Sequence, residues 1–114
     1  DLPALKYAIM VNGVTELTMM KADVLDKFDT IKACTHYIIN GERFDYFPYD
    51  ITDCEVTPVY EELKGWNCDL TALNDWSKAP RALIDYVSYL ERNLEVPITV
   101  VSVGPDRKQT LNTK

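Results

Sequence analysis

Glycine, histidine and closely spaced cysteine are scarce in this sequence, and each shortage excludes a class of site. The 114 residues include four glycines, all far apart, so the chain cannot build a glycine-rich loop that cradles phosphates. The single histidine, His36, lies beside Tyr37 without a nucleophile signature, which favours a structural role. Three widely spaced cysteines without a C-x-x-C motif predict reduced thiols, mostly in the core, rather than disulfides or a zinc site. We therefore expect no catalytic residue and no metal ligand.

Long apolar runs and an excess of basic residues are missing too. No segment approaches the roughly 20 apolar residues of a membrane-spanning helix, and no basic-then-apolar secretory signal opens the chain. Twelve basic residues against 18 acidic residues give a net charge of −6, which disfavours a nucleic-acid surface. We expect a cytoplasmic protein with neither a membrane nor a nucleic-acid partner. A first residue of Asp1 rather than Met is typical of a processed or excised chain.

The composition predicts a single folded domain over residues 1–114. Hydrophobic residues make up 46% of the chain and charged residues 26%, which is ordinary for a globular domain of this length. The expected elements are a helix ending at Asn12-Gly13, a strand at 17–21, a turn or short helix at 22–29, strands at 31–39 and 43–49, an extended segment at 57–63, a short helix at 70–76, a helix at 80–95, a strand at 98–101 and a frayed tail at 108–114. This order predicts an α/β protein, or α+β for a fragment, with a mixed sheet, one β-hairpin and packed helices.

Two of these elements carry strong local signals. Asn40-Gly41 predicts the hairpin turn, because both central residues of a type I′ turn need a positive φ. In the 80–95 segment, one apolar stripe at helical spacing is formed by Leu83, Val87, Leu90 and Leu94.

Two polar motifs follow the apolar strands at 17–21 and 98–101. They are Met-Lys-Ala-Asp at 20–23 and Ser-Val-Gly-Pro at 102–105. Ligands bind beyond the carboxyl ends of strands in open parallel sheets, so Asp23 and the 102–104 backbone face one crevice if these strands are neighbours. A carboxylate there can accept both donors on the Watson–Crick edge of guanine, the ring N–H and the exocyclic amine. Adenine presents a lone pair in place of the ring N–H.

The neighbouring residues suit the same base. The Lys21 stem can lie along the ring while its charge reaches solvent. A backbone N–H near Ser102 or Gly104 can donate to the guanine carbonyl, and Gly104 allows a close approach because it has no Cβ. Each motif also has a structural interpretation: Asp23 can cap a short helix that begins near Val24, and Ser-x-Gly-Pro is a common turn. From these residues alone both interpretations stay open.

Several motifs, taken in order, resemble the C-terminal part of the adenylosuccinate synthetase family. They are Lys-Ala-Asp-Val-Leu-Asp at 21–26, Pro-Val-Tyr-Glu at 58–61 with Gly65-Trp66, the helix that leads into Val-Pro-Ile at 96–98, and Val-Ser-Val-Gly-Pro-Asp-Arg at 101–107. The resemblance runs from about Leu5 to Thr110, which is nearly the whole chain.

The resemblance implies part of a P-loop-like nucleotide-binding ligase of purine biosynthesis. The family joins IMP to L-aspartate at the expense of GTP, with magnesium, as a cytoplasmic homodimer. The guanine pocket of the family uses a Lys-x-Asp and a Ser-x-Gly element, which correspond here to Lys21, Ala22 and Asp23 and to Ser102, Val103 and Gly104. The family often has Thr and Leu where this chain has Met20 and Ala22, which puts a hydroxyl contact in doubt but not the carboxylate contact.

The family's phosphate loop, catalytic Asp and His, IMP site and aspartate-binding loop all precede this region. We therefore expect a piece that supplies the guanine pocket, binds no cofactor in isolation and is inactive alone. The alternative is a stand-alone α+β binding or interaction module without enzymatic activity, which the length of the parent reading frame would distinguish. We also expect apolar surface exposed by excision to promote self-association.

Overall fold

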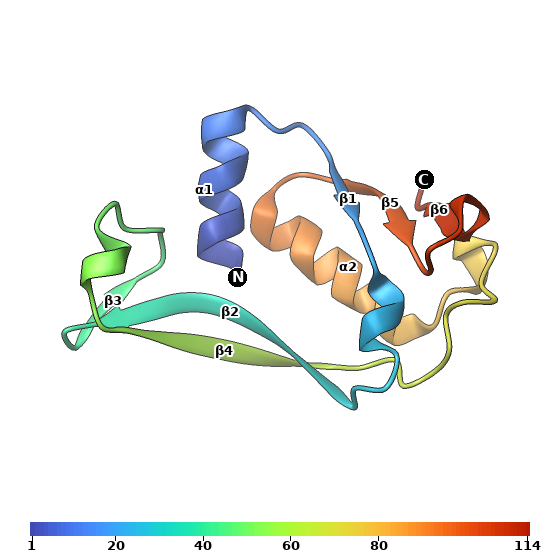
Figure 1. Ribbon diagram of the computed structural model, residues 1–114, viewed down its shortest axis with the longest axis horizontal. Helices are drawn as coiled ribbons and strands as arrows, with labels where there is room; N and C mark the ends of the chain where they lie inside the picture. Colours follow the sequence, from blue (N-terminus) through green and yellow to red (C-terminus); the bar gives the residue numbers. More distant parts are fainter.

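Two small sheets and two helices build the chain. The computed structural model describes all of residues 1–114. The element order is α1 (Leu2–Asn12), β1 (Leu17–Met19), the 3₁₀ helix η1 (Ala22–Leu25), β2 (Thr30–Ile39), β3 (Glu42–Phe44), η2 (Ile51–Asp53), β4 (Val56–Lys64), η3 (Trp76–Lys78), α2 (Arg81–Leu94), β5 (Ile98–Ser102), η4 (Arg107–Gln109) and β6 (Thr110–Asn112). The molecule is elongated, 45 × 32 × 23 Å, with the β2–β4 ribbon along its length (Figure 1). The expected α+β class is confirmed, although the strands divide between two sheets.

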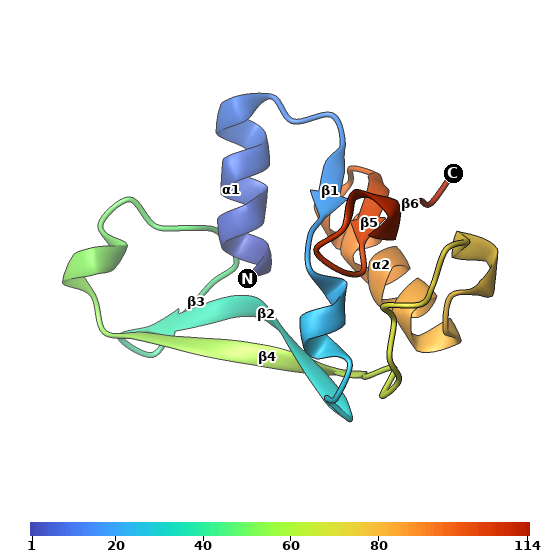
Figure 2. The ribbon, with the colours of Figure 1, turned by 45° about the vertical axis from the view of Figure 1, so that its right-hand side comes forward.

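The first sheet is mixed and has the order β1-β5-β6. Strand β1 runs parallel to β5, with Met19 opposite Val101, and β6 runs antiparallel to β5. Figure 2 shows the three strands side by side, close to the C-terminus. Helix α2 covers this sheet through Leu83 and Val87, which join Ile98 and Val101 in the main core. The apolar stripe predicted for α2 is therefore confirmed.

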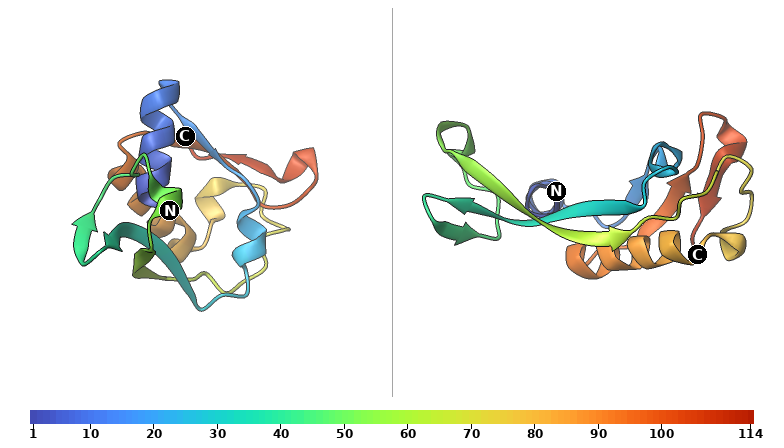
Figure 3. Two further views of the ribbon diagram at one scale, coloured as in Figure 1. Left: turned by 60° about the vertical axis from the view of Figure 1, so that its left-hand side comes forward. Right: turned by 90° about the horizontal axis from the view of Figure 1, so that it is seen from below.

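The second sheet is antiparallel and has the order β3-β2-β4. Asn40 and Gly41 both have positive φ values, 51° and 80°, and form the predicted tight turn between β2 and β3. Strand β4 is the principal partner of β2 and pairs with it from Thr30 opposite Lys64 to Ile39 opposite Val56. Figure 3 shows the resulting twisted ribbon, which reaches well beyond α2. Both helices pack on the ribbon through a small cluster of Leu2, Ala33, Tyr89 and Leu94.

The expected return strand at 43–49 is too long. Strand β3 ends at Phe44, and three residues later Phe47 packs against α1 instead of extending the strand. Phe47 stacks on Tyr7 of α1, with ring centroids 5.6 Å apart, and meets the edge of Tyr37. This aromatic packing competes successfully with continued strand pairing.

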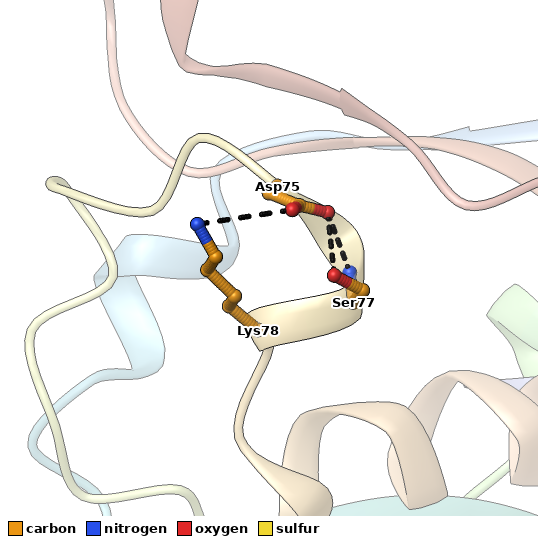
Figure 4. Close-up of polar contacts among 3 residues, drawn as sticks. All are labelled: Asp75, Ser77 and Lys78. Atoms are coloured by element: carbon orange, nitrogen blue, oxygen red, sulfur yellow. Dashed lines mark hydrogen bonds and ion pairs between the residues drawn. The ribbon is translucent and has the colours of Figure 1, made fainter.

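The expected helix at 70–76 is wrong. Short polar side chains hydrogen-bond to nearby backbone there, which competes with helix formation. Asp69 accepts from the Thr71 N–H and hydroxyl. Asp75 accepts from the Ser77 N–H and hydroxyl and caps η3, with Lys78 at 3.9 Å (Figure 4). These bonds hold the pKa of the Asp75 carboxyl below its usual value, the Ser77 hydroxyl contributing most.

The expected frayed tail is also wrong. Residues 110–112 form β6, and Leu111 is only 4% exposed because it completes the main core. Thr113 adds bonds from its N–H to the Thr99 carbonyl and from its hydroxyl to the Ile98 carbonyl. A single apolar residue among polar ones is a weak strand signal, but here it is enough to order the end of the chain.

The cysteines only partly follow expectation. All three are free, but only Cys34 is buried, while Cys54 is half-buried and Cys68 is exposed. His36 lies in β2 with its ring Nδ1 2.9 Å from the Thr35 hydroxyl. No helix has the length and the apolar character needed to cross a membrane.

Candidate functional site

The two motifs at the strand ends lie at the same edge of the first sheet. Because β1 and β5 are parallel neighbours, their carboxyl ends point the same way, and residues 20–23 and 102–107 leave the sheet together. The condition that the sequence left open, that these two strands are adjacent, is thus met. This edge is where open α/β sheets place their ligands.

A cavity of about 670 Å³ lies between the two motifs. Its size suits a drug-sized or nucleoside-sized ligand. The lining residues are Met20, Lys21, Asp23, Val24, Ser102, Gly104, Pro105, Asp106, Arg107 and Thr110. Four of the six expected site residues therefore line one cavity. The other two, Ala22 and Val103, are fully buried and pack in the main core.

Asp23 is the most unusual group on this cavity. Its Oδ1 is buried and has no hydrogen-bond partner in the protein. A buried acceptor left unpaired costs about 1–3 kcal/mol, so folded proteins rarely keep one without a use. The expected alternative role of Asp23 as a helix cap is not observed, because η1 begins after Lys21 without a side-chain cap.

Asp26, one turn further along, has the opposite character. Its two carboxylate oxygens accept 2.8 Å hydrogen bonds, one from the Trp66 indole N–H and one from the Leu70 N–H. Trp66 and Leu70 are both buried. Asp26 thus ties η1 to the 65–70 segment, while Asp23 carries out no such structural task.

Lys21 sets the direction in which the chain enters η1. Its backbone is left-handed, with φ 59° and ψ 44°. This conformation is uncommon for a residue with a long side chain, and such strained residues cluster at functional sites. The Lys21 carbonyl accepts from the Val24 N–H at 3.2 Å, which closes the turn. The bend brings Asp23 back towards the end of β5.

The opposite wall of the cavity is the turn after β5. The Ser102 hydroxyl donates to the Gly104 carbonyl at 3.0 Å, and the Val103 N–H donates to the Gln109 carbonyl at 2.8 Å. The Gly104 N–H has no acceptor in the protein. Gly104 makes a contact that the sequence did not reveal: a Cβ there would meet the end of the Gln109 side chain, which would have to move.

Sequence reasoning missed the charged residue Arg107. It lines the cavity and makes no ion pair, so it adds an unpaired positive charge to the lining that Asp23 also contributes to. Its place in the Gly-Pro-Asp-Arg motif was the available signal.

A second cavity, of about 750 Å³, shares Asp23 and Val24 with the first and is otherwise lined by Asp26, Lys27, Phe28, Asn67, Cys68 and Asp69. Although Cys68 is exposed, partial desolvation raises the pKa of its thiol, and the charges of Asp26 and Asp69 raise it further. The thiol is therefore a weak nucleophile at neutral pH.

No three His, Cys, Asp or Glu side chains in the chain converge as a metal site requires.

Comparison with known proteins decides the family. The model of the adenylosuccinate synthetase family matches residues 1–111. This chain belongs to the adenylosuccinate synthetase family. The resemblance inferred from the motifs at 21–26 and 101–107 is confirmed.

Adenylosuccinate synthetases of several organisms are similar to this chain. The one from Bacteroides fragilis is 60% identical over 111 residues, and the one from Flavobacterium johnsoniae is 55% identical over 111 residues. In each case the match covers 97% of this chain and 26% of the relative. A solved structure titled "Structure of fully ligated Adenylosuccinate synthetase from Plasmodium falciparum" has a TM-score of 0.91 at 30% identity, covering 100% of this chain and 28% of the other. The chain thus spans about a quarter of the length of the synthetases it matches.

Proposed function

We propose that this chain is the C-terminal, guanine-recognising part of an adenylosuccinate synthetase. The whole enzyme would be a ligase of purine biosynthesis that joins IMP and L-aspartate to form adenylosuccinate at the expense of GTP. The observation that carries the proposal is the Asp23 carboxylate, which has no hydrogen-bond partner and lines a cavity opposite the Ser102–Gly104 turn.

The chemistry of the two walls suits guanine. Asp23 supplies two acceptor oxygens for the ring N–H and the exocyclic amine, and the free Gly104 N–H supplies a donor for the carbonyl. Adenine would set a lone pair against the carboxylate, and an unpaired buried group is costly. Because Asp23 Oδ1 is buried, the proposal includes a rotation of this carboxylate when the base enters.

The proposal gives the chain no part in phosphate chemistry. It has no glycine-rich loop, and its side chains offer no cluster that fits Mg²⁺. We therefore assign the phosphates, the magnesium, IMP and L-aspartate to the rest of the enzyme and expect the chain alone to be inactive. A homodimeric, cytoplasmic enzyme stays a prediction from the family.

Chemical-shift titration with GMP and with AMP tests the base preference. We expect GMP to shift the amides of residues 21–24 and 102–107 and AMP to shift them much less. Asp23→Ala should abolish the GMP shifts. Asp53→Ala is a matched control, because Asp53 is an exposed carboxylate without a side-chain hydrogen bond and lies outside the cavity. Equal shifts from AMP would contradict the proposal.

The affinity of the isolated chain is expected to be weak, because it lacks phosphate contacts. The same variants are therefore also tested in the full-length synthetase that carries this segment. There Asp23→Ala should raise the KM for GTP, and Asp53→Ala should leave it unchanged. An unaltered KM in the Asp23 variant would refute the role of this carboxylate.

A further inference from the structure

Gln109 makes four hydrogen bonds, three to the turn after β5 and one to Thr71. Its side-chain Oε1 accepts from the Asp106 N–H at 3.0 Å, and its Nε2 donates to the Thr71 carbonyl at 2.9 Å. Its backbone carbonyl accepts from the Val103 N–H at 2.8 Å, and its own N–H donates to the Asp106 carbonyl at 2.9 Å. The turn from Val103 to Asp106 is therefore fastened at both ends to one residue.

Two further observations show how closely this residue shapes the turn. The Gln109 side chain fills the space in which a Cβ of Gly104 would lie, so it packs directly against that backbone. With Asp106 it forms a capping box around η4, in which each side chain bonds to the backbone of the other residue. The bond to Thr71 also ties the turn to the segment between β4 and α2, which is remote in sequence.

Gln109 does not line the cavity itself. Its half-buried side chain packs against Gly104, and Gly104 does line the cavity. We propose that Gln109 is a positioning residue for guanine recognition: it fixes the turn so that the Gly104 N–H is held ready for the base carbonyl opposite Asp23. This inference rests on the proposed function and adds a specific residue to it. Groups held in place before a ligand arrives bind it more tightly, because less conformational entropy is lost.

Asp23 and Gln109 are proposed to act on different groups of the base, so two nucleotides that differ in one of these groups can test the inference. Guanine and hypoxanthine share the carbonyl and the ring N–H, but only guanine has the exocyclic amine. Removal of the Asp23 carboxylate should therefore raise the KM for GTP by a larger factor than the KM for ITP. Removal of the Gln109 side-chain hydrogen bonds should raise both KM values by the same factor, because it disturbs only the donor to the shared carbonyl.

The experiment measures the KM for GTP and for ITP, and kcat, in the full-length synthetase that carries this segment. Gln109→Met keeps the length of the side chain and removes both of its hydrogen bonds. We expect the KM for both nucleotides to rise about tenfold, the worth of roughly one hydrogen bond, with kcat and the KM for L-aspartate unchanged. Gln109→Glu keeps the acceptor for Asp106 but replaces the donor to Thr71 with a charged oxygen that repels the Thr71 carbonyl, so it should also raise both KM values. Asn112→Met is the matched control, because Asn112 is an exposed amide on β6 whose side chain makes no hydrogen bond.

Each outcome has a distinct meaning. A KM for GTP within about twofold of wild type in both Gln109 variants would overturn the inference, as would a fall in kcat with no rise in KM. If Gln109→Met fails to fold, the rise in both KM values expected of Gln109→Glu decides the matter. The proposed function fails separately, if Asp23→Ala leaves the ratio of the GTP and ITP KM values unchanged.

Discussion

The two aspartates of η1 should respond in opposite ways to removal of their carboxylates. In Asp26→Ala, the Trp66 indole N–H and the Leu70 N–H both lose their acceptor in a buried environment. Hydrogen bonds to a charged group contribute about 1.5–3 kcal/mol each, and two on one carboxylate are not fully additive. We expect the free energy of unfolding to fall by about 2–4 kcal/mol.

Asp23→Ala should leave the free energy of unfolding almost unchanged. Its Oδ1 is buried without a partner, so the substitution removes an unfavourable group rather than a bond. The small stabilising effect of a negative charge near the start of a helix, about 0.3–1 kcal/mol, is lost at the same time. The expected change lies between zero and a gain of about 1 kcal/mol.

Urea unfolding of the 114-residue chain, followed by circular dichroism, measures both changes under one set of conditions. Asp26→Asn keeps one acceptor oxygen but turns an amide N–H₂ towards the other buried N–H, so it should destabilise the chain about as much as Asp26→Ala. The reasoning is refuted if Asp23→Ala destabilises the chain as much as Asp26→Ala. That result would mean that the Asp23 carboxylate is engaged in the fold and is not free for a ligand.

Three further predictions concern residues outside the cavity. Gly65→Ala should destabilise the chain by about 1–3 kcal/mol or more in urea unfolding, because the new Cβ would collide with the Phe28 carbonyl. Ser77→Ala should raise the pKa of Asp75 in a carboxyl titration by NMR; since that pKa is lowered by folding, its contribution to stability is present at neutral pH and is lost as the pH falls through the folded pKa. Burial raises the pKa of Tyr89 to about 12, and the hydrogen bond that Tyr89 donates to Glu61 and the charge of Glu61 contribute to this rise. The native state therefore holds this proton more tightly, and stability should decline as the pH rises from about 10 to about 12, a decline that Tyr89→Phe should remove.

Local signals predicted the elements whose determinants lie within a few residues. The Asn40-Gly41 turn follows from the backbone needs of two residues, and α2 follows from the spacing of one apolar stripe. The helix expected at 70–76 failed because Asp69 and Asp75 satisfy backbone N–H groups in turns, a competition that periodicity does not register. The ordered tail was missed because one side chain, Leu111, contributes to a core assembled from distant segments.

The candidate site shows the same division. The residue types of the Lys-x-Asp and Ser-x-Gly motifs were sufficient to name Lys21, Asp23, Ser102 and Gly104, all of which line one cavity. Neither the contact between Gly104 and Gln109 nor the role proposed for Gln109 could be found this way. Both depend on a side chain that folds back over a turn five residues away.

The sequence by itself determined the family, the polar motifs and the elements that short-range hydrogen bonding and periodicity specify. Only the tertiary structure decided that β1 and β5 are parallel neighbours, and hence that residues 20–23 and 102–107 face each other. It also decided that both carboxylate oxygens of Asp26 accept hydrogen bonds within the fold, while the buried oxygen of Asp23 accepts none. Strand pairing and hydrogen-bond partners depend on which apolar surfaces are buried together, and such contacts join residues that are far apart in the chain.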